Sequence, residues 1–239
     1  MRRALVTGGS GAIGAAICRR LAQDGVYVVV HAHQHATQGE LVVRSIREAG
    51  GSAAVVAFDI TDPQASAAAI ADLLASGPIQ VLIHVAGIHI DAPMAGMAAG
   101  QWRRVIDVSL NGFYNVAQPL LLPMIGTRWG RIVAISSVSA IMGNRGQTNY
   151  AAAKAGLIGA ARALSLECAS RGVTVNVVAP GIIDTPATSG IFDRAKIEAL
   201  VPMRRAGRPE EVAELVAFVA SDRAAYLTGQ TISINGGMA

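Results

Sequence analysis

Residues 4–14 read Ala-Leu-Val-Thr-Gly-Gly-Ser-Gly-Ala-Ile-Gly, an apolar run that breaks into a glycine-rich turn. A helical pattern of apolar residues follows, and a second apolar run spans residues 26–30. This order predicts a strand, a turn, a helix and a second strand, which together form half of a doubly wound sheet. Glycines let the backbone approach a pyrophosphate, and the N-terminus of the helix favours the charge of that group. The stretch therefore indicates a dinucleotide site, although the G-x-G-x-x-G spacing of Gly9, Gly11 and Gly14 is a weak signal alone.

A second motif lies far along the chain, where Tyr150-Ala151-Ala152-Ala153-Lys154 follows Ser137 by thirteen residues. On a helix the side chains at positions i and i+4 share a face, so the phenol and the ammonium are expected to meet. A neighbouring cation favours the charged form of an acid, so Lys154 is expected to lower the pKa of Tyr150 from its usual value of about 10. That shift would make the phenol a usable acid/base near neutral pH.

Short apolar runs alternate with helix-like stretches along the rest of the chain, with no linker or internal repeat between them. This alternation predicts a single α/β domain over residues 1–239, a Rossmann-type doubly wound parallel sheet flanked by helices on both faces. The expected strands after the first two are residues 55–58, 81–85, 131–136, 173–178 and 231–234.

The composition limits the partners and the compartment. The formal net charge is +4 with no dense run of Lys or Arg, so nucleic acid is not an expected partner. Only Cys18 and Cys168 occur, which fits a reduced intracellular compartment. The glycines interrupt the first apolar run too early for a signal peptide, and no stretch is long enough to span a membrane. We therefore expect a cytoplasmic protein.

Taken in this order, the motifs resemble the short-chain dehydrogenase/reductase family over essentially the whole chain. Within that family the sequence looks most like the 3-oxoacyl-[acyl-carrier-protein] reductases. The segment 142–147, Met-Gly-Asn-Arg-Gly-Gln, is similar to a branch found in aryl-polyene pigment pathways. The stretches that carry the main resemblance are residues 180–185, 204–212, 225–229 and the closing 235–238.

The resemblance implies NADPH-dependent reduction of a 3-oxoacyl thioester, held on acyl carrier protein, in fatty-acid or related acyl-chain synthesis. Ser137 would donate a hydrogen bond to the substrate carbonyl oxygen, where negative charge builds as hydride arrives. Tyr150 would supply the proton, and Lys154 would hold the nicotinamide ribose. The cofactor provides the hydride, so placement and electrostatics are the protein's own task.

Two positions depart from the family pattern. Ser109 stands where relatives have a fourth catalytic residue, an asparagine thought to act through its backbone carbonyl and a bend in its helix. Serine also bonds locally to helix backbone, so that role can survive the replacement. His84-Val85-Ala86-Gly87 stands where relatives read Asn-Asn-Ala-Gly. With Val85 in place of asparagine, the chain lacks a side-chain amide that normally ties adjacent strands together.

The expected cofactor is NADP(H), because no acidic residue occurs between Asp24 and Glu40 to bind the ribose hydroxyls of NAD. The position expected for such an acid is Ala32, and His33, Gln34 or His35 would contact a 2′-phosphate instead. The resemblance extends the expected cofactor site to Gly8, Ser10, Gly11, Ala12, Ile13, Gly14, His33, Gln34, Asp59, Ile60, Ala86, Gly87, Tyr150, Lys154, Pro180, Gly181, Ile183 and Thr185.

The alternating histidines 31, 33 and 35 share one face of a strand and so raise the alternative of a metal site. No Cys, Asp or Glu joins them, so contacts to the nucleotide or plain surface positions are the preferred interpretation and no metal is expected. His84 and His89 are interpreted as structural or pocket-lining residues.

Arg128 and Arg171 match positions that carry carrier-protein docking arginines in the reductases that this chain resembles. A basic pair beside the mouth of the site would steer an acidic carrier protein, although a helix end also favours a cation at Arg171. Residues 187–203 are expected to form an apolar substrate lid, and residues 151–163 to support a homotetramer.

Two rival functions stay open on the sequence alone. One is a dehydrogenase of the same fold that acts on a small secondary alcohol or sugar. The other is a divergent cofactor-binding copy with low activity, which the departures at Ser109 and Val85 motivate.

Overall fold

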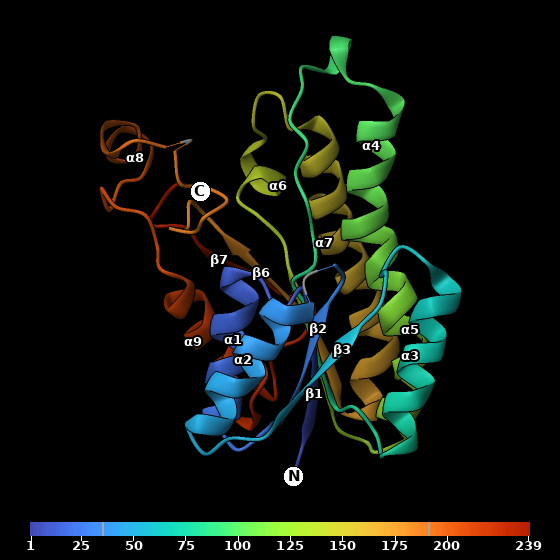
Figure 1. Ribbon diagram of the computed structural model, residues 1–239. Coiled ribbons are helices and arrows are strands. Elements are labelled where there is room, and N and C mark those ends of the chain that lie inside the picture. The colour runs from blue at the N-terminus through green and yellow to red at the C-terminus, as the bar shows by residue number, and fades with distance from the viewer. Residues whose placement is uncertain (35, 191) are drawn as a thin grey trace.

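The computed structural model describes residues 1–34, 36–190 and 192–239, and its centre is a seven-stranded parallel sheet (Figure 1). The strand order is β3-β2-β1-β4-β5-β6-β7. All seven strands predicted from the apolar runs are present, and the doubly wound parallel sheet is confirmed. The strands are β1 (Arg3–Thr7), β2 (Tyr27–Ala32), β3 (Ala53–Ala57), β4 (Val81–His84), β5 (Gly130–Ile135), β6 (Val173–Pro180) and β7 (Thr231–Ile234).

Helices cover both faces of the sheet, and each covered face has its own apolar core. One core lies under α1 (Ala12–Gln23), α2 (Ala36–Glu48) and α9 (Pro209–Val219). The other lies under α3 (Pro63–Ala75), α5 (Gly112–Gly126) and α7 (Thr148–Cys168). Because both faces are buried, the central strands are continuous Val/Ile/Leu runs rather than alternating ones.

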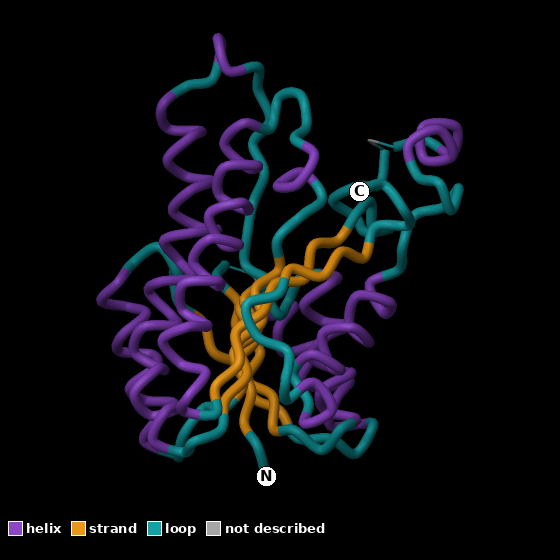
Figure 2. Tube along the Cα trace, turned by 180° about the vertical axis from the view of Figure 1, so that it is seen from behind, coloured by secondary structure: helices purple, strands orange, loops and turns teal. Residues whose placement is uncertain are grey.

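Shorter elements complete the chain and gather at the carboxyl ends of the strands. The tube view shows α4 and the surrounding loops rising beyond the sheet on this side, with the N-terminus at the other (Figure 2). The remaining elements are η1 (Met94–Gly96), α4 (Ala99–Ile106), η2 (Asp107–Asn111), α6 (Ser139–Met142), η3 (Ala169–Arg171), α8 (Arg194–Leu200) and η4 (Asp222–Ala224).

The strand order reverses between β1 and β4, because β2 continues the sheet on one side of β1 and β4 on the other. Ligands of open parallel sheets bind at such a switch point, outside the carboxyl ends of the strands. The glycine turn follows β1 at this point, and Ser137 follows β5 two strands away. The fold thus brings both sequence motifs to one edge of the sheet.

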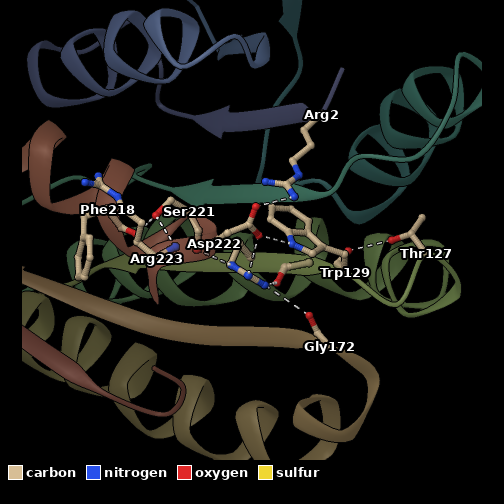
Figure 3. Close-up of polar contacts among 10 residues, drawn as sticks. Arg2, Thr127, Trp129, Gly172, Phe218, Ser221, Asp222 and Arg223 are labelled. Atoms are coloured by element: carbon tan, nitrogen blue, oxygen red, sulfur yellow. Dashed lines mark hydrogen bonds and ion pairs between the residues drawn. The ribbon is translucent and has the colours of Figure 1, made fainter. Parts of the chain in front are cut away.

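The opposite edge is held together by an arginine–tryptophan cluster around Asp222 (Figure 3). The guanidinium groups of Arg2 and Arg131 lie 3.7 and 4.3 Å from the ring centroid of Trp129. The Trp129 indole N–H and the Arg2 guanidinium both donate to the Asp222 carboxylate. This cluster ties the N-terminus and β5 to the turn after α9, far from the carboxyl edge of the sheet.

Among the described residues, no helix combines the length and apolar character that a membrane crossing needs. The expected lid contains a turn at residues 185–190 and the helix α8. Its Leu200 side chain is exposed, whereas Val201 is buried. His35 of the histidine motif and Ile191 of the expected lid lie outside the described residues.

Candidate active site

The glycine turn is shaped by close backbone approach between β1 and α1. Gly8 has a φ of +63°, which favours glycine, and a β-carbon on Gly14 would overlap the carbonyl oxygen of Gly8. Ala12, the first residue of α1, is exposed. The first turn of α1 carries no acidic residue, so its amide groups remain available to an anionic ligand.

His31 fixes this turn to two strands from below. The Gly8 amide donates to His31 Nδ1 at 3.2 Å, and His31 Nε2 bonds to the carbonyl oxygen of Phe58 at 3.1 Å. A carbonyl only accepts, so Nε2 carries the proton and Nδ1 is left free to accept. Burial lowers the pKa of His31 to about 4 and keeps the ring neutral. The interpretation of His31 as a surface or nucleotide contact was therefore wrong, because its ring is only 2% exposed.

Thr7, the last residue of β1, ties β1 to the loop after β4. Its hydroxyl oxygen accepts hydrogen bonds from the amides of Val85 and Ala86 at 3.1 and 3.2 Å. The side-chain amide that is absent at Val85 is thus not needed to connect β1 with the end of β4, because these backbone amides and the Thr7 side chain make the connection. Gly87 follows directly, and it is exposed beside the end of the sheet.

Two hydrogen bonds join the end of β5 to α7. The Ser136 hydroxyl donates to the backbone carbonyl of Lys154 at 2.8 Å, and Lys154 Nζ donates to the carbonyl of Ile135 at 2.8 Å. Ser137 is the next residue, and its side chain hydrogen bonds to Tyr150. The structure therefore brings together Ser137, Tyr150 and Lys154, as their spacing predicts.

The acid–base character of this trio is set by burial. Burial raises the pKa of Tyr150, outweighing the hydrogen bond from Ser137, and Asp91 raises it further. The expectation that Lys154 lowers this pKa was wrong for this geometry, because the amine lies 5.8 Å from the ring centroid and donates to Ile135 instead. Burial lowers the pKa of Lys154 itself to about 8. The pKa values of the two groups consequently lie farther apart than those of free tyrosine and lysine, with the lysine below the tyrosine.

Ser109 lies in the π-helical turn η2 between α4 and α5, where the Gly112 amide bonds to the carbonyl of Asp107. The bend that the resemblance implied at this position is therefore present with serine in place of asparagine. The Ser109 carbonyl accepts a hydrogen bond from His84 Nε2 at 3.0 Å. Its hydroxyl is buried and finds no hydrogen-bond partner in the part of the chain that the structure describes.

Gly87 separates this turn from the lysine. A β-carbon on Gly87 would lie 2.9 Å from Lys154 Nζ and 3.2 Å from the Ser109 hydroxyl. The missing side chain therefore leaves space that is shared by the ammonium and the serine. Because two of these groups are buried and polar, this space suits a polar ligand atom or a water.

The expected adenosine end of the site lies at the ends of β2 and β3. Asp59 accepts from the amide and hydroxyl of Thr61, and His33 Nε2 lies 3.5 Å from the Asp59 carboxylate. Ala32 is only 1% exposed, so a side chain there does not face a ligand. His33, with 47% of its side chain exposed, is the residue at this strand end that can meet a ribose or its phosphate.

The other side of the expected cofactor site follows β6. A β-carbon on Gly181 would lie 2.8 Å from the Asn235 α-carbon, so the segments that follow β6 and β7 pack tightly against each other. Ile183 is buried and pairs with Gly207, and the Thr185 amide bonds to the Thr188 hydroxyl. The expected residues Ser10, Ile13, Gln34 and Ile60 lie on the loops and helix start beyond the carboxyl ends of the strands, and Pro180 is the last residue of β6.

Sequence reasoning missed several polar residues around Tyr150. Gln147 donates to Asp91 at 2.9 Å and accepts from the Ser139 hydroxyl, which links the loop after β4 to the start of α7. Buried Asn149 caps the Tyr150 amide through its side-chain oxygen. The His89 ring meets the Tyr150 ring edge-on at 6.5 Å, which supports the pocket-lining interpretation. No spacing rule connects these residues, which come from separate segments.

The arginine pair does not lie beside this site. Arg128 and Arg171 precede β5 and β6, whereas Ser137 follows β5, so the pair and the catalytic trio lie at opposite edges of the sheet. Within a single chain, the pair therefore does not lie at the mouth of the site, where the sequence predicted it. Arg128 adopts a φ of +51° and its carbonyl packs against Gly172, which places the two arginines' turns next to each other.

Comparison with known proteins agrees with this geometry. A family described as "Enoyl-(Acyl carrier protein) reductase" matches residues 8–239. A 3-oxoacyl-[acyl-carrier-protein] reductase of Aggregatibacter actinomycetemcomitans is 44% identical over 236 residues, covering 98% of each chain. The chain belongs to the short-chain dehydrogenase/reductase family.

Two further relatives cover nearly the whole chain. Nodulation protein G of Azospirillum brasilense is 41% identical over 98% of this chain and 97% of its own. An acetoacetyl-CoA reductase of Allochromatium vinosum is 41% identical over 99% of this chain and 98% of its own. The resemblance stated from the sequence is thus confirmed, and this short-chain dehydrogenase/reductase is an oxidoreductase that uses a nicotinamide cofactor.

The residues at the carboxyl edge of the sheet fit such a cofactor. A side chain on Gly14 would fill the cradle between β1 and α1, and the missing side chain of Gly87 leaves space beside Lys154. Gly8, Gly14 and the start of α1 would hold the pyrophosphate, and Tyr150 and Lys154 would face the nicotinamide ribose.

The buried histidines of this short-chain dehydrogenase/reductase predict a loss of stability in mild acid. The folded pKa is about 4 for His31 and about 3 for His84, both lowered first by burial, against about 6.5 in the unfolded chain. Below pH 6.5 these two histidines therefore bind protons in the unfolded chain but stay neutral in the folded protein. The free energy of unfolding consequently decreases as the pH is lowered. We expect the free energy of unfolding to drop by about 2 kcal/mol for each histidine between pH 7 and pH 5.

Urea unfolding at pH 7, 6 and 5 measures this drop in the free energy of unfolding. These pH values lie above the range in which carboxylates titrate. The variant His31→Asn keeps an acceptor for the Gly8 amide but has no titrating ring, so its pH slope should be shallower. An equal slope in the variant and the wild type would contradict the assignment to His31.

Proposed function

We propose that this protein reduces a 3-oxoacyl thioester to the 3-hydroxyacyl product, with NADPH as cofactor and acyl carrier protein as the carrier of the substrate. The observation that supports it is the placement of Ser137, just after β5, near Tyr150 and Lys154 of α7 and beside the cofactor cradle. Relatives at 44% and 41% identity are a 3-oxoacyl-carrier-protein reductase and an acetoacetyl-CoA reductase, both of which act on 3-oxoacyl thioesters.

The trio supplies what carbonyl reduction needs from the protein. A bound nicotinamide cofactor supplies the hydride. Ser137 donates a hydrogen bond toward the carbonyl oxygen, where negative charge grows, and the buried setting strengthens that bond. Tyr150 transfers its phenolic proton to the same oxygen, so the alcohol forms without a free alkoxide. Lys154 donates to the carbonyl of Ile135 and would hold the nicotinamide ribose, so its part is to position the cofactor beside Tyr150.

NADPH is preferred over NADH on the charges at the end of β2. No acid lies where the ribose hydroxyls of NAD would be bound, and Ala32 is buried. His33 is exposed and lies 3.5 Å from the Asp59 carboxylate. A 2′-phosphate would meet His33 and Gln34 there, while Asp59 faces the adenine side.

Docking of a carrier protein requires a second copy of the chain. Arg128 and Arg171 lie at the amino edge of the sheet, so neither reaches the site of its own chain. We therefore place the docking pair beside the site of a neighbouring subunit in a homo-oligomer. The exposed Leu122 of α5 and Leu166 of α7 give those helices an apolar outer face for such packing.

The first test is NADPH oxidation with acetoacetyl-carrier protein and acetoacetyl-CoA, in the wild type and in Tyr150→Phe. Removing the phenolic proton donor should lower kcat by about 10²–10⁴-fold, because Tyr150 is the group that transfers a proton to the carbonyl oxygen in this mechanism. Binding of NADPH, followed by its fluorescence, should be retained in the variant.

Three substrate controls separate the rivals. Turnover of an enoyl thioester in place of the 3-oxoacyl thioester would move the activity to carbon–carbon double-bond reduction. Turnover of small secondary alcohols or sugars alone would favour the rival dehydrogenase. Tight NADPH binding without turnover of any substrate would favour the divergent cofactor-binding copy.

The cofactor preference is tested by His33→Asp. A carboxylate at this exposed position repels the 2′-phosphate and can accept from ribose hydroxyls, so KM for NADPH should rise at least about tenfold. KM for NADH should stay the same or fall. A steady-state comparison of both cofactors measures the change, with His33→Asn as the uncharged control. An unchanged ratio of the two kcat/KM values would show that residue 33 does not face the phosphate.

Docking by the arginine pair is tested by Arg128→Glu and Arg171→Glu. Reversing a steering charge should raise KM for acetoacetyl-carrier protein about tenfold and weaken its salt dependence. KM for acetoacetyl-CoA should change little, since that substrate brings no acidic protein surface. The exposed Arg194→Glu, on α8, is the control for net charge. Equal effects on both substrates would mean that the pair does not bind the carrier.

A further inference from the structure

The ring of His84 lies between the strand end that holds the glycine turn and the helix bend that carries Ser109. His84 is the last residue of β4 and its side chain is fully buried. Its Nδ1 lies 3.1 Å from the Thr7 hydroxyl, and its Nε2 lies 3.0 Å from the carbonyl oxygen of Ser109. Both ring nitrogens are therefore used within the protein.

The direction of each hydrogen bond in this chain is fixed by its ends. The Ser109 carbonyl can only accept, so His84 Nε2 carries the proton and Nδ1 is an acceptor. The Thr7 hydroxyl must then donate to Nδ1, because its oxygen already accepts from the amides of Val85 and Ala86. Two backbone amides thus orient the hydroxyl, the hydroxyl sets the tautomer, and the ring delivers one N–H to residue 109.

The carbonyl that receives this N–H belongs to the turn nearest Lys154. In a π-helical turn the regular carbonyl-to-amide pairing is interrupted, so a buried carbonyl there needs another donor. The Ser109 side chain lies within 3.2 Å, and Lys154 Nζ within 2.9 Å, of the place that a β-carbon on Gly87 would take. A shift of the turn would therefore alter the surroundings of the ammonium directly.

We propose that His84 is a positioning residue for the reaction, which holds the Ser109 carbonyl and the π-turn in register with Lys154 through its Nε2–H. The ring acts through Ser109 and touches neither substrate nor cofactor. His84 stands where relatives have asparagine, and Ser109 also stands where they have asparagine, so this chain carries a different pair at two positions that are in contact. The proposal rests on the proposed reductase activity for its kinetic readout only.

The variants His84→Gln and His84→Asn form a matched test. The amide nitrogen of glutamine reaches the place of Nε2 and keeps a donor for the Ser109 carbonyl. The shorter asparagine reaches only the place of Nδ1, so it keeps an acceptor for Thr7 and leaves that carbonyl unpaired. Both side chains are neutral amides, and both remove the imidazole.

We expect His84→Gln to keep kcat within about threefold and His84→Asn to lose about tenfold or more, with the Kd for NADPH unchanged in both. The basic limb of the pH profile of kcat should also shift in His84→Asn, since the surroundings of Lys154 change. Equal losses in the Gln and Asn variants would overturn the proposal.

A second measurement is independent of activity. Nitrogen NMR of histidine-labelled apoprotein, with His84 assigned by its loss in His84→Gln, should show Nε2 protonated and Nδ1 unprotonated. Amide exchange over residues 107–113 should quicken in His84→Asn relative to His84→Gln. The opposite tautomer, or equal exchange in the two variants, would refute the role of His84 even if the wild type reduces no thioester. Absence of thioester turnover in the wild type would instead refute the proposed function.

Discussion

The catalytic end of this protein depends on how the last residues of β5 are bonded to α7. The Ser136 hydroxyl donates to the backbone carbonyl of Lys154, and the Lys154 amine donates to the backbone carbonyl of Ile135. The end of β5 and the helix α7 are thus joined by two reciprocal hydrogen bonds. Buried polar groups are costly unless they are paired, which makes this exchange demanding of geometry. Ser137 and Tyr150 flank the two bonded segments and inherit their placement. Without this attachment, the thirteen-residue spacing between Ser137 and Tyr150 would not bring the two side chains together.

The expected cofactor site depends instead on close backbone packing in the glycine turn and on buried side chains that hydrogen bond to the backbone around it. Gly8 and Gly14 allow β1 and α1 to meet, His31 accepts a hydrogen bond from the Gly8 amide, and Thr7 accepts from the amides of Val85 and Ala86 after β4. Burial keeps the His31 ring neutral, so it can accept from Gly8. The first turn of α1 has no acidic residue and no side-chain cap, so its amides are available to an anion.

The fold and the catalytic trio could be predicted from the sequence because both follow from local spacing. Seven apolar runs became seven strands, since strands buried on both faces need continuous apolar residues. The role of Thr7 could not be predicted, because nothing in a threonine shows that it will receive the amides of Val85 and Ala86. The raised pKa of Tyr150 depends on the depth of its burial, which spacing does not reveal. The place of Arg128 was within reach, since a residue that precedes a parallel strand must lie at the amino edge.

The contact between His84 and Ser109 joins residues that are 25 positions apart in the chain. Residue 84 ends a central strand and residue 109 lies in a helical bend, and neither belongs to the glycine motif or to the tyrosine–lysine motif. The bond uses the backbone carbonyl of residue 109, so exchange of residue 109 alone preserves it, whereas exchange of residue 84 can leave that buried carbonyl without a donor. A chimaera that takes these two segments from different parents therefore keeps the bond only where residue 84 supplies the donor.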